Sequence, residues 1–234
     1  MDRNNRGDPN VDDEVRKAPL FTALDDEAAH AVRTSMTEVT LAKGEVLFHE
    51  GDAGDRLYVI AEGKIKLGTK ISDGRENLLS LLGPGEMFGE LSLFDPGPRT
   101  STATALTDAR LLALAHQDLE PWLNGRPEVA KHLLRALAQR LRRTNEAVGD
   151  LVFSDVPGRV AKALADLARR FGTKSADGLY VAHDLTQEEL AQLVGASRET
   201  VNKALADFAS RGWLRLEARA VVILDEERLA KRGR

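Results

Sequence analysis

The spacing of apolar residues changes near Pro121, and this change constrains the fold of the 234-residue chain more than any other feature. Upstream, short runs of β-forming residues are separated by turns rich in Gly, Asp and Pro, which is typical of a β-sandwich or roll. Downstream, apolar residues recur every three or four positions, which indicates helices. We therefore expect an α+β fold. Its strands are predicted over 45–49, 56–61, 64–71, 77–82, 101–104 and 110–115.

The first long helix carries a heptad seam. Its positions alternate at spacings of four and three residues: Ala130, Leu134, Leu137, Leu141, Thr144, Val148 and Leu151. The polar residues around the seam favour a parallel coiled-coil dimer, although a helix packed on its own domain has the same spacing. A hydroxyl in an apolar seam costs free energy unless it is paired. Thr144, with Asn145 beside it, therefore predicts a polar contact near the dimer axis.

Turn-forming residues mark the boundaries between the parts of the chain. Residues 1–12 are polar, which predicts a disordered tail, and a helical entry broken at Pro19 is expected over about 13–36. A turn-rich stretch over 154–158 predicts a hinge. The expected parts are a β-rich domain over 13–120, a dimerisation helix over 121–153 and a C-terminal domain over 154–234.

Composition excludes several classes of protein. Without cysteine, the chain holds no disulfide, Cys-based zinc site or iron–sulfur cluster. No signal peptide is recognised and no apolar run approaches the roughly 18 residues of a membrane span, so we expect a cytoplasmic protein. The five histidines form no constellation, and neither a metal site nor catalytic residues are expected. Residues 151–234 carry 14 Lys and Arg against 12 Asp and Glu, which favours nucleic acid only weakly.

Residues 186–205 predict two short helices joined by a tight turn. Thr186 and Glu189 have the spacing of a capping box, Gly195 permits the turn and Ser197 caps the second helix. Apolar faces follow on both helices. This arrangement matches the helix-turn-helix that binds DNA, and 212–216 with 220–224 predict a β-hairpin wing after it.

The exposed start of the second helix carries Arg198, Glu199, Asn202 and Lys203. Arg can pair with guanine, and Glu can accept from the amino group of cytosine, so this face suits base reading. The alternative is a solvated helix face with an internal Arg198–Glu199 charge pattern. Arg215 and Arg219 of the wing either contact phosphates or are ordinary surface residues.

The Gly- and Pro-rich stretch over 89–101 lies among the strands, with one helical turn expected at 90–93. Arg99 supplies a planar cation suited to a phosphate, and Glu90 is an acceptor for a ribose hydroxyl. Taken alone, these residues favour an ordinary loop in which Arg99 pairs with Glu90 or Asp95.

Three motifs in one chain resemble the CRP/FNR family of regulators, and within it the GlxR-like branch of cyclic AMP receptor proteins. Residues 89–92 through Arg99-Thr100 resemble its phosphate-binding cassette. Residues 156–160 resemble the helix after its hinge, and 195–201 resemble its recognition helix. The resemblance covers nearly the whole chain, from about Leu20 to Leu229.

The resemblance implies a homodimer that binds cyclic AMP, as an allosteric ligand rather than a cofactor, in an N-terminal β-roll. It implies a C-terminal winged helix-turn-helix that binds palindromic operators, and RNA polymerase as a further partner. Glu90 would hold the ribose 2′-hydroxyl and Arg99 the cyclic phosphate. Ligand contacts are implied for Gly89, Glu90, Leu91, Ser92, Arg99, Thr100, Thr144 and Asn145, and DNA contacts for Ser197, Arg198, Glu199, Thr200, Asn202 and Lys203.

The chain also departs from the best-known enterobacterial member. Its cassette is one residue shorter before Arg99, Asn145 replaces a Ser, and Lys203 replaces a base-reading Arg, so affinity and base specificity are expected to differ. One alternative is a regulator of the same fold that ignores cyclic nucleotides or senses another ligand, such as haem. Another is a nucleotide-regulated enzyme, but the residues after the hinge are nearly all used by the helix-turn-helix and wing.

Overall fold

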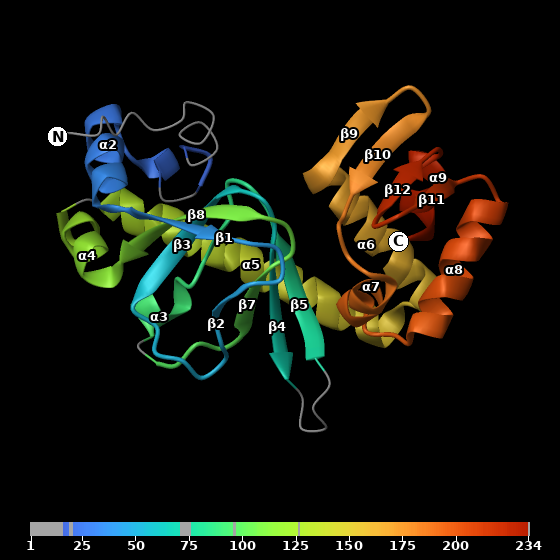
Figure 1. Ribbon diagram of the computed structural model, residues 1–234, viewed down its shortest axis with the longest axis horizontal. Helices are drawn as coiled ribbons and strands as arrows, with labels where there is room; N and C mark the ends of the chain where they lie inside the picture. The colour runs from blue at the N-terminus through green and yellow to red at the C-terminus, as the bar shows by residue number, and fades with distance from the viewer. Residues whose placement is uncertain (1–15, 19–20, 71–75, 96, 126, 234) are drawn as a thin grey trace. The chain divides into compact units, whose positions relative to one another are not determined.

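The computed structural model describes residues 16–18, 21–70, 76–95, 97–125 and 127–233. The chain divides into two compact units (Figure 1). The first comprises Met1–Thr69 and Ser80–Leu141, and the second Lys70–Leu79 and Arg142–Arg234. Helix α5 (Pro127–Phe153) contributes residues to both units. The boundaries expected at 120 and 153 stay a prediction, and the tail expected over 1–12 lies outside the described residues.

Two four-stranded sheets form the β-roll. The first has the order β1 (Thr37–Leu41), β8 (Ala109–Ala115), β3 (Arg56–Glu62), β6 (Met87–Phe88), with antiparallel neighbours. The second has the order β2 (Val46–Phe48), β7 (Thr102–Ala105), β4 (Ile65–Lys70), β5 (Glu76–Leu82). All six predicted strands are confirmed within a few residues, except that Ile71 lies outside the described residues. Strands β1 and β6 were not predicted, because β6 has two residues and β1 begins where the entry helix was expected to end.

Short helices complete the first unit. The entry contains a 3-10 turn η1 (Phe21–Ala23) and helix α2 (Asp26–Ser35), whose N-cap Asp25 accepts from Ala28 N–H at 2.8 Å. The predicted break at Pro19 lies outside the described residues. Helices α3 (Leu91–Phe94) and α4 (His116–Gly125) follow. Val129 and Leu133 of α5 are fully buried and share one hydrophobic core with α2, β3 and β8.

The second unit is a winged helix-turn-helix. It contains α6 (Val156–Phe171), α7 (Gln187–Val194), α8 (Arg198–Ser210) and α9 (Glu226–Arg232). A sheet has the order β11 (Leu214–Glu217), β12 (Ala220–Ile223), β10 (Gly178–Ala182), β9 (Gly172–Ser175). The predicted wing is confirmed as the β11–β12 hairpin. Strands β9 and β10 and helix α9 were not predicted.

Local sequence signals explain the helix-turn-helix. The capping box between Thr186 and Glu189 is present, and Gly195 ends α7 at φ +64°, a conformation that favours glycine. Ser197 caps α8. The apolar faces of two helices are buried throughout: Val160, Ala161, Leu164, Leu167 and Ala168 of α6, and Val201, Ala204, Leu205 and Phe208 of α8. Within the described residues, no helix is long and apolar enough to span a membrane.

Candidate functional site

Arg99 is a buried cation at the edge of the β-roll. Its backbone N–H donates to Asp52 at 2.7 Å and its carbonyl accepts from Gly51 at 2.8 Å. The residue is only 6% exposed, and its guanidinium lies 4.3 Å from the centre of the Phe48 ring. Such a cation is costly to bury unless it is paired, because the charge loses its hydration.

The hydrogen bonds of Arg99 go to uncharged groups. It donates to the carbonyl of Arg56 at 2.9 Å and to that of Gly89 at 3.2 Å, while Nε finds no partner within the described part of the chain. The pairing with Glu90 or Asp95 that the loop alone favoured is not found among the described residues. The guanidinium is therefore positioned by neutral acceptors and keeps one donor for another group.

Gly89 allows the close approach to Arg99. Its φ is +83°, and a Cβ there would lie 2.8 Å from both the Arg56 carbonyl oxygen and Nη1 of Arg99. Ser92 donates to the Gly89 carbonyl at 3.2 Å and lies 3.4 Å from Arg99 Nη1. This backbone conformation and this spacing both require glycine.

Glu90 is the second buried charge, with a side chain that is 3% exposed. Its Oε1 accepts from Nη1 of Arg140 at 2.7 Å. Its Oε2 has no hydrogen-bond partner among the described residues, although it is buried. Arg140 lies on α5 and was not predicted. Nothing in the sequence separated it from the other arginines of that helix.

A hollow of about 350 Å³, counting its open side, lies beside these groups. The predicted residues Gly89, Leu91, Ser92, Arg99 and Thr100 line it, whereas Glu90 is buried next to them. Thr144 and Asn145 are exposed on α5 and are not among the lining residues. The lining that was not predicted is Phe48, Leu67, Phe88, Pro98, Ser101 and Arg140.

Two titratable neighbours of Arg99 are neutral near pH 7. Burial raises the pKa of the Tyr58 hydroxyl, against the opposing influence of Arg99. Burial also lowers the pKa of His116, and the positive charge of Arg99 lowers it further, while Asp55 opposes both.

The exposed start of α8 carries the predicted base-reading residues. Glu199 accepts from Lys203 at 2.7 Å, so the internal charge pair involves Lys203 rather than the expected Arg198. Ser197 caps the helix and also contacts the Thr200 hydroxyl at 2.9 Å. Asn202 is partly buried, and its Oδ1 is unpaired within the described part of the chain.

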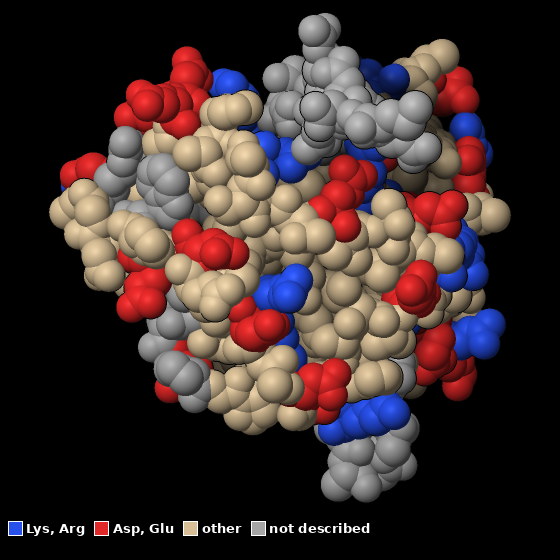
Figure 2. Space-filling model, turned by 60° about the vertical axis from the view of Figure 1, so that its left-hand side comes forward, with Lys and Arg blue, Asp and Glu red and all other residues tan. Residues whose placement is uncertain are grey.

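The wing arginines have partners within the protein. Arg215 pairs with Asp177 at 3.1 Å and with Glu217 at 3.3 Å. Arg219 donates to the Asp184 carbonyl at 3.2 Å. On the face drawn in Figure 2, which turns the left-hand side of Figure 1 toward the viewer, acidic and basic residues are interspersed. Contact between these arginines and phosphates stays a prediction.

The seam of α5 is open to solvent in the single chain. Leu134, Leu141, Val148 and Leu151 are each more than half exposed. A row of large apolar side chains at heptad spacing is costly to leave in water. These four side chains are therefore largely uncovered within the single chain.

Comparisons with known proteins agree with this arrangement. Residues 38–125 match the family described as cyclic nucleotide-binding domain, and residues 158–232 match the Crp-like helix-turn-helix domain. Fold and matches together define a transcription regulator that carries a cyclic nucleotide-binding domain and a DNA-binding helix-turn-helix. The chain belongs to the CRP/FNR family.

Individual relatives cover nearly the whole chain. It is 55% identical to the "CRP-like cAMP-activated global transcriptional regulator" of Mycobacterium tuberculosis, over 96% of this chain and 100% of that protein. It is 37% identical to the "Cyclic AMP receptor protein" of Thermus thermophilus, over 91% and 97%. The solved structure of FixK2 from Bradyrhizobium japonicum is 25% identical, with a TM-score of 0.75 and coverage of 84% and 96%.

Proposed function

We propose that the protein is a cyclic AMP-responsive regulator, with the ligand held beside Arg99. The observation that carries the proposal is a buried guanidinium without a carboxylate partner, next to a hollow, with Nε still unpaired among the described residues. A cyclic phosphate brings one negative charge and several acceptor oxygens, which offset the cost of burying this cation. Both relatives named above carry cyclic AMP in their names.

The remaining contacts follow from the same arrangement. Gly89, Ser92 and Thr100 would contact the phosphate, because they line the same hollow as Arg99 and Leu91. Glu90 would accept from the ribose 2′-hydroxyl through Oε2, which is unpaired among the described residues, while Arg140 holds its other oxygen. For Thr144 and Asn145, contact with adenine rests on the family resemblance alone.

Calorimetric titration with cyclic AMP tests this site. The wild type should bind, and Arg99→Leu should lose about 2–5 kcal/mol of binding free energy, at least thirtyfold in affinity. Arg169→Leu is the control, because Arg169 is exposed and pairs with Asp166 of its own helix. Affinity retained by Arg99→Leu would remove the residue from the site. No heat from the wild type would favour a regulator that senses another ligand.

Sequence-specific DNA binding is assigned to the start of α8. Arg198, Glu199, Asn202 and Lys203 would meet base edges there, and Ser197 and Thr200 the neighbouring backbone. Glu199 pairs with Lys203 at 2.7 Å on this exposed face in the absence of DNA. Lys203 is a point charge rather than a fork, so its base preference is expected to be looser than that of arginine.

A second copy of the chain is the partner assigned to the α5 seam. Parallel pairing would bury the exposed leucines and valine and bring Thr144 near the dimer axis. Two α8 helices spaced by about 34 Å would then fit a palindromic operator. Sedimentation should show a dimer, and Leu141→Asn should weaken it. A monomeric wild type would contradict the assignment.

The proposed function also implies a cellular compartment and a protein partner. A bacterial regulator that binds chromosomal DNA works in the cytoplasm, and its effect on transcription implies RNA polymerase as a partner. Binding of polymerase to an operator fragment, with and without the protein, tests this partnership. An unchanged polymerase affinity would contradict it.

A further inference from the structure

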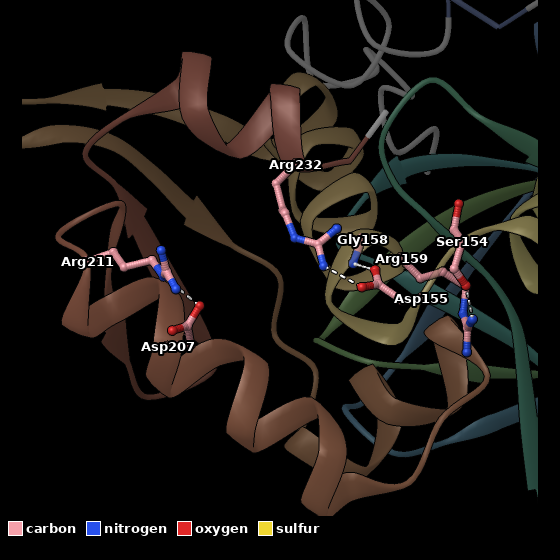
Figure 3. Close-up of polar contacts among 7 residues, drawn as sticks. All are labelled: Ser154, Asp155, Gly158, Arg159, Asp207, Arg211 and Arg232. Atoms are coloured by element: carbon pink, nitrogen blue, oxygen red, sulfur yellow. Dashed lines mark hydrogen bonds and ion pairs between the residues drawn. The ribbon is translucent and has the colours of Figure 1, made fainter.

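Arg159 joins the end of the long helix to the turn of the helix-turn-helix. Its Nη1 donates to the carbonyl of Ser154 at 2.7 Å, directly after the last residue of α5 (Figure 3). Its Nε donates to the carbonyl of Val194 at 2.8 Å and its Nη2 to that of Gly195 at 3.2 Å. One side chain thus connects two elements that are about 40 residues apart in sequence.

The three acceptors explain why a guanidinium stands at this position. Val194 is the last residue of α7, Gly195 is its C-cap, and Ser154 follows α5. Carbonyls at helix C-termini lack intrahelical partners and carry partial negative charge. A planar fork with five donors satisfies several of them at once, whereas an ammonium cannot span the same set.

The backbone that carries Arg159 is itself fixed. Asp155 caps α6 by accepting from Gly158 N–H at 2.9 Å, and its other oxygen accepts from Arg232 at 2.6 Å. Figure 3 shows these contacts beside Arg159. Gly158 also leaves room for Arg232, because a Cβ there would lie 3.1 Å from Nη1 of Arg232. A displacement at the end of α5 is therefore not absorbed by the start of α6.

An apolar contact joins the same two places. A Cβ at Gly195 would lie 2.8 Å from Cδ2 of Leu151, so the last turns of α5 pack directly on the turn before α8. Ser197, the N-cap of α8, follows Gly195 by two residues. The position of the recognition helix is thus linked to the backbone at the end of α5 by one polar and one apolar contact.

We propose that Arg159 is a positioning residue, which transmits a change at the end of α5 to the turn that sets the recognition helix. The inference rests on the proposed control of DNA binding by cyclic AMP. It assigns the transfer of that control to three hydrogen bonds. A ligand shifts the equilibrium between two conformations of a protein only if the two conformations make different contacts. The three hydrogen bonds of Arg159 are contacts that one conformation can make and the other can lose.

The experiment measures the gain in DNA affinity that cyclic AMP produces. Full-length protein is titrated into a labelled operator, selected from random DNA by the wild type, at fixed salt with and without saturating cyclic AMP. Arg159→Lys keeps the charge but loses the fork. Arg169→Lys is the matched control, because it makes the same change on the same helix at an exposed residue that pairs with Asp166. Affinity for cyclic AMP without DNA and the unfolding temperature are measured for each variant.

We expect Arg159→Lys to reduce the gain by about fivefold or more, which is the lower end of typical coupling. Its cyclic AMP affinity should stay within about twofold of the wild type, and Arg169→Lys should keep the full gain. An unchanged gain in Arg159→Lys overturns the inference. Equal loss of DNA binding with and without ligand, together with a lower unfolding temperature, also overturns it, because Arg159 would then be merely structural. If cyclic AMP leaves the DNA affinity of the wild type unchanged, the proposed function itself is refuted.

Discussion

Arg140 donates a 2.7 Å hydrogen bond to Glu90, a residue fifty positions earlier whose side chain is only 3% exposed. The carboxylate is held by a helix that also carries the seam of exposed leucines. Breaking a buried ion pair from one side leaves an uncompensated charge, which costs more than the pair contributes when intact.

Removal of Arg140 should therefore destabilise the protein. Arg140→Gln is expected to lower the free energy of unfolding by about 2–3 kcal/mol, less than for a fully buried pair because Arg140 is 39% exposed. Adding Glu90→Gln should restore much of the loss. Urea denaturation of both variants checks this, with the exposed Arg135→Gln as control. A double variant as unstable as Arg140→Gln would contradict the interpretation.

Gly89→Ala should be worse than the same change at Gly44. Both glycines have similar positive φ values, +83° and +86°, so both substitutions incur the backbone strain of about 1–2 kcal/mol. A Cβ at Gly44 meets nothing within 4 Å, whereas one at Gly89 displaces the guanidinium of Arg99. Gly89→Ala should therefore also weaken cyclic AMP binding in calorimetry. Equal affinity in the two variants would show that the guanidinium position does not matter.

Stability should fall on acidification through His116. Burial, and then the charge of Arg99, hold the pKa of His116 below that of the unfolded chain, so the unfolded state binds the proton first. The contribution of His116 is fully present above about pH 6.5 and is lost as the pH falls toward the lower folded pKa. His116→Gln should flatten the pH dependence of unfolding between about pH 7 and 5.5. An identical dependence in both proteins would rule this out.

The same residue predicts a proton linkage of ligand binding. A cyclic phosphate at Arg99 offsets one of the causes that lower the pKa of His116, so binding should raise that pKa and take up a proton. Affinity for cyclic AMP should then increase as the pH falls from about 7 to 6. Calorimetry in two buffers of different ionisation enthalpy measures the uptake. Its persistence in His116→Gln would point to another group.

Glu199→Ala should relax base preference more than it weakens binding. Discrimination at the base pair read by the carboxylate should fall by about 1–3 kcal/mol, while non-specific affinity stays the same or rises, because a negative charge is lost. Asp207→Ala removes the same charge from the same helix, where Asp207 pairs with Arg211. Titration of operators with single substitutions gives the ranking. An unchanged ranking in Glu199→Ala would exclude base reading by this residue.

The pair between Asp155 and Arg232 should contribute less than the cap that Asp155 makes. Hydrogen bonds from Arg232 and from Gly158 N–H hold the pKa of Asp155 below its usual value. Asp155→Ala loses both contacts and should cost about 1–2 kcal/mol, whereas Arg232→Gln loses an exposed pair and should cost under about 1 kcal/mol. The double variant should match Asp155→Ala in urea denaturation. Additive losses would mean that the two residues act independently.

Local signals made much of the fold predictable from sequence. The capping box of Thr186 and Glu189, the turn at Gly195 and the buried face of α8 each depend on residues within one or two helical turns. Strand periodicity gave six of the strands in the same way. These features could be predicted because the physical cause lies within the same short segment.

Features that depend on distant partners were missed. Strand β9 contains no large apolar side chain that would mark it as a strand in the sequence. It forms because it pairs with β10, where Thr173 lies opposite Tyr180. Phe48 lies under Arg99, and Arg140 reaches Glu90, only because the fold brings distant segments together. For the site itself, the sequence indicated the residues of the cassette, but not the Phe48 ring that packs against Arg99 or the Arg140 side chain that pairs with Glu90.

Control of operator binding by a ligand held at Arg99 is tested most directly by one titration. Labelled operator is bound by the wild type and by Arg99→Leu, each with and without cyclic AMP. The wild type should gain at least about fivefold in DNA affinity on adding the ligand, and Arg99→Leu should gain nothing while keeping its ligand-free affinity. A ligand-dependent gain of the same size in Arg99→Leu would contradict the central claim.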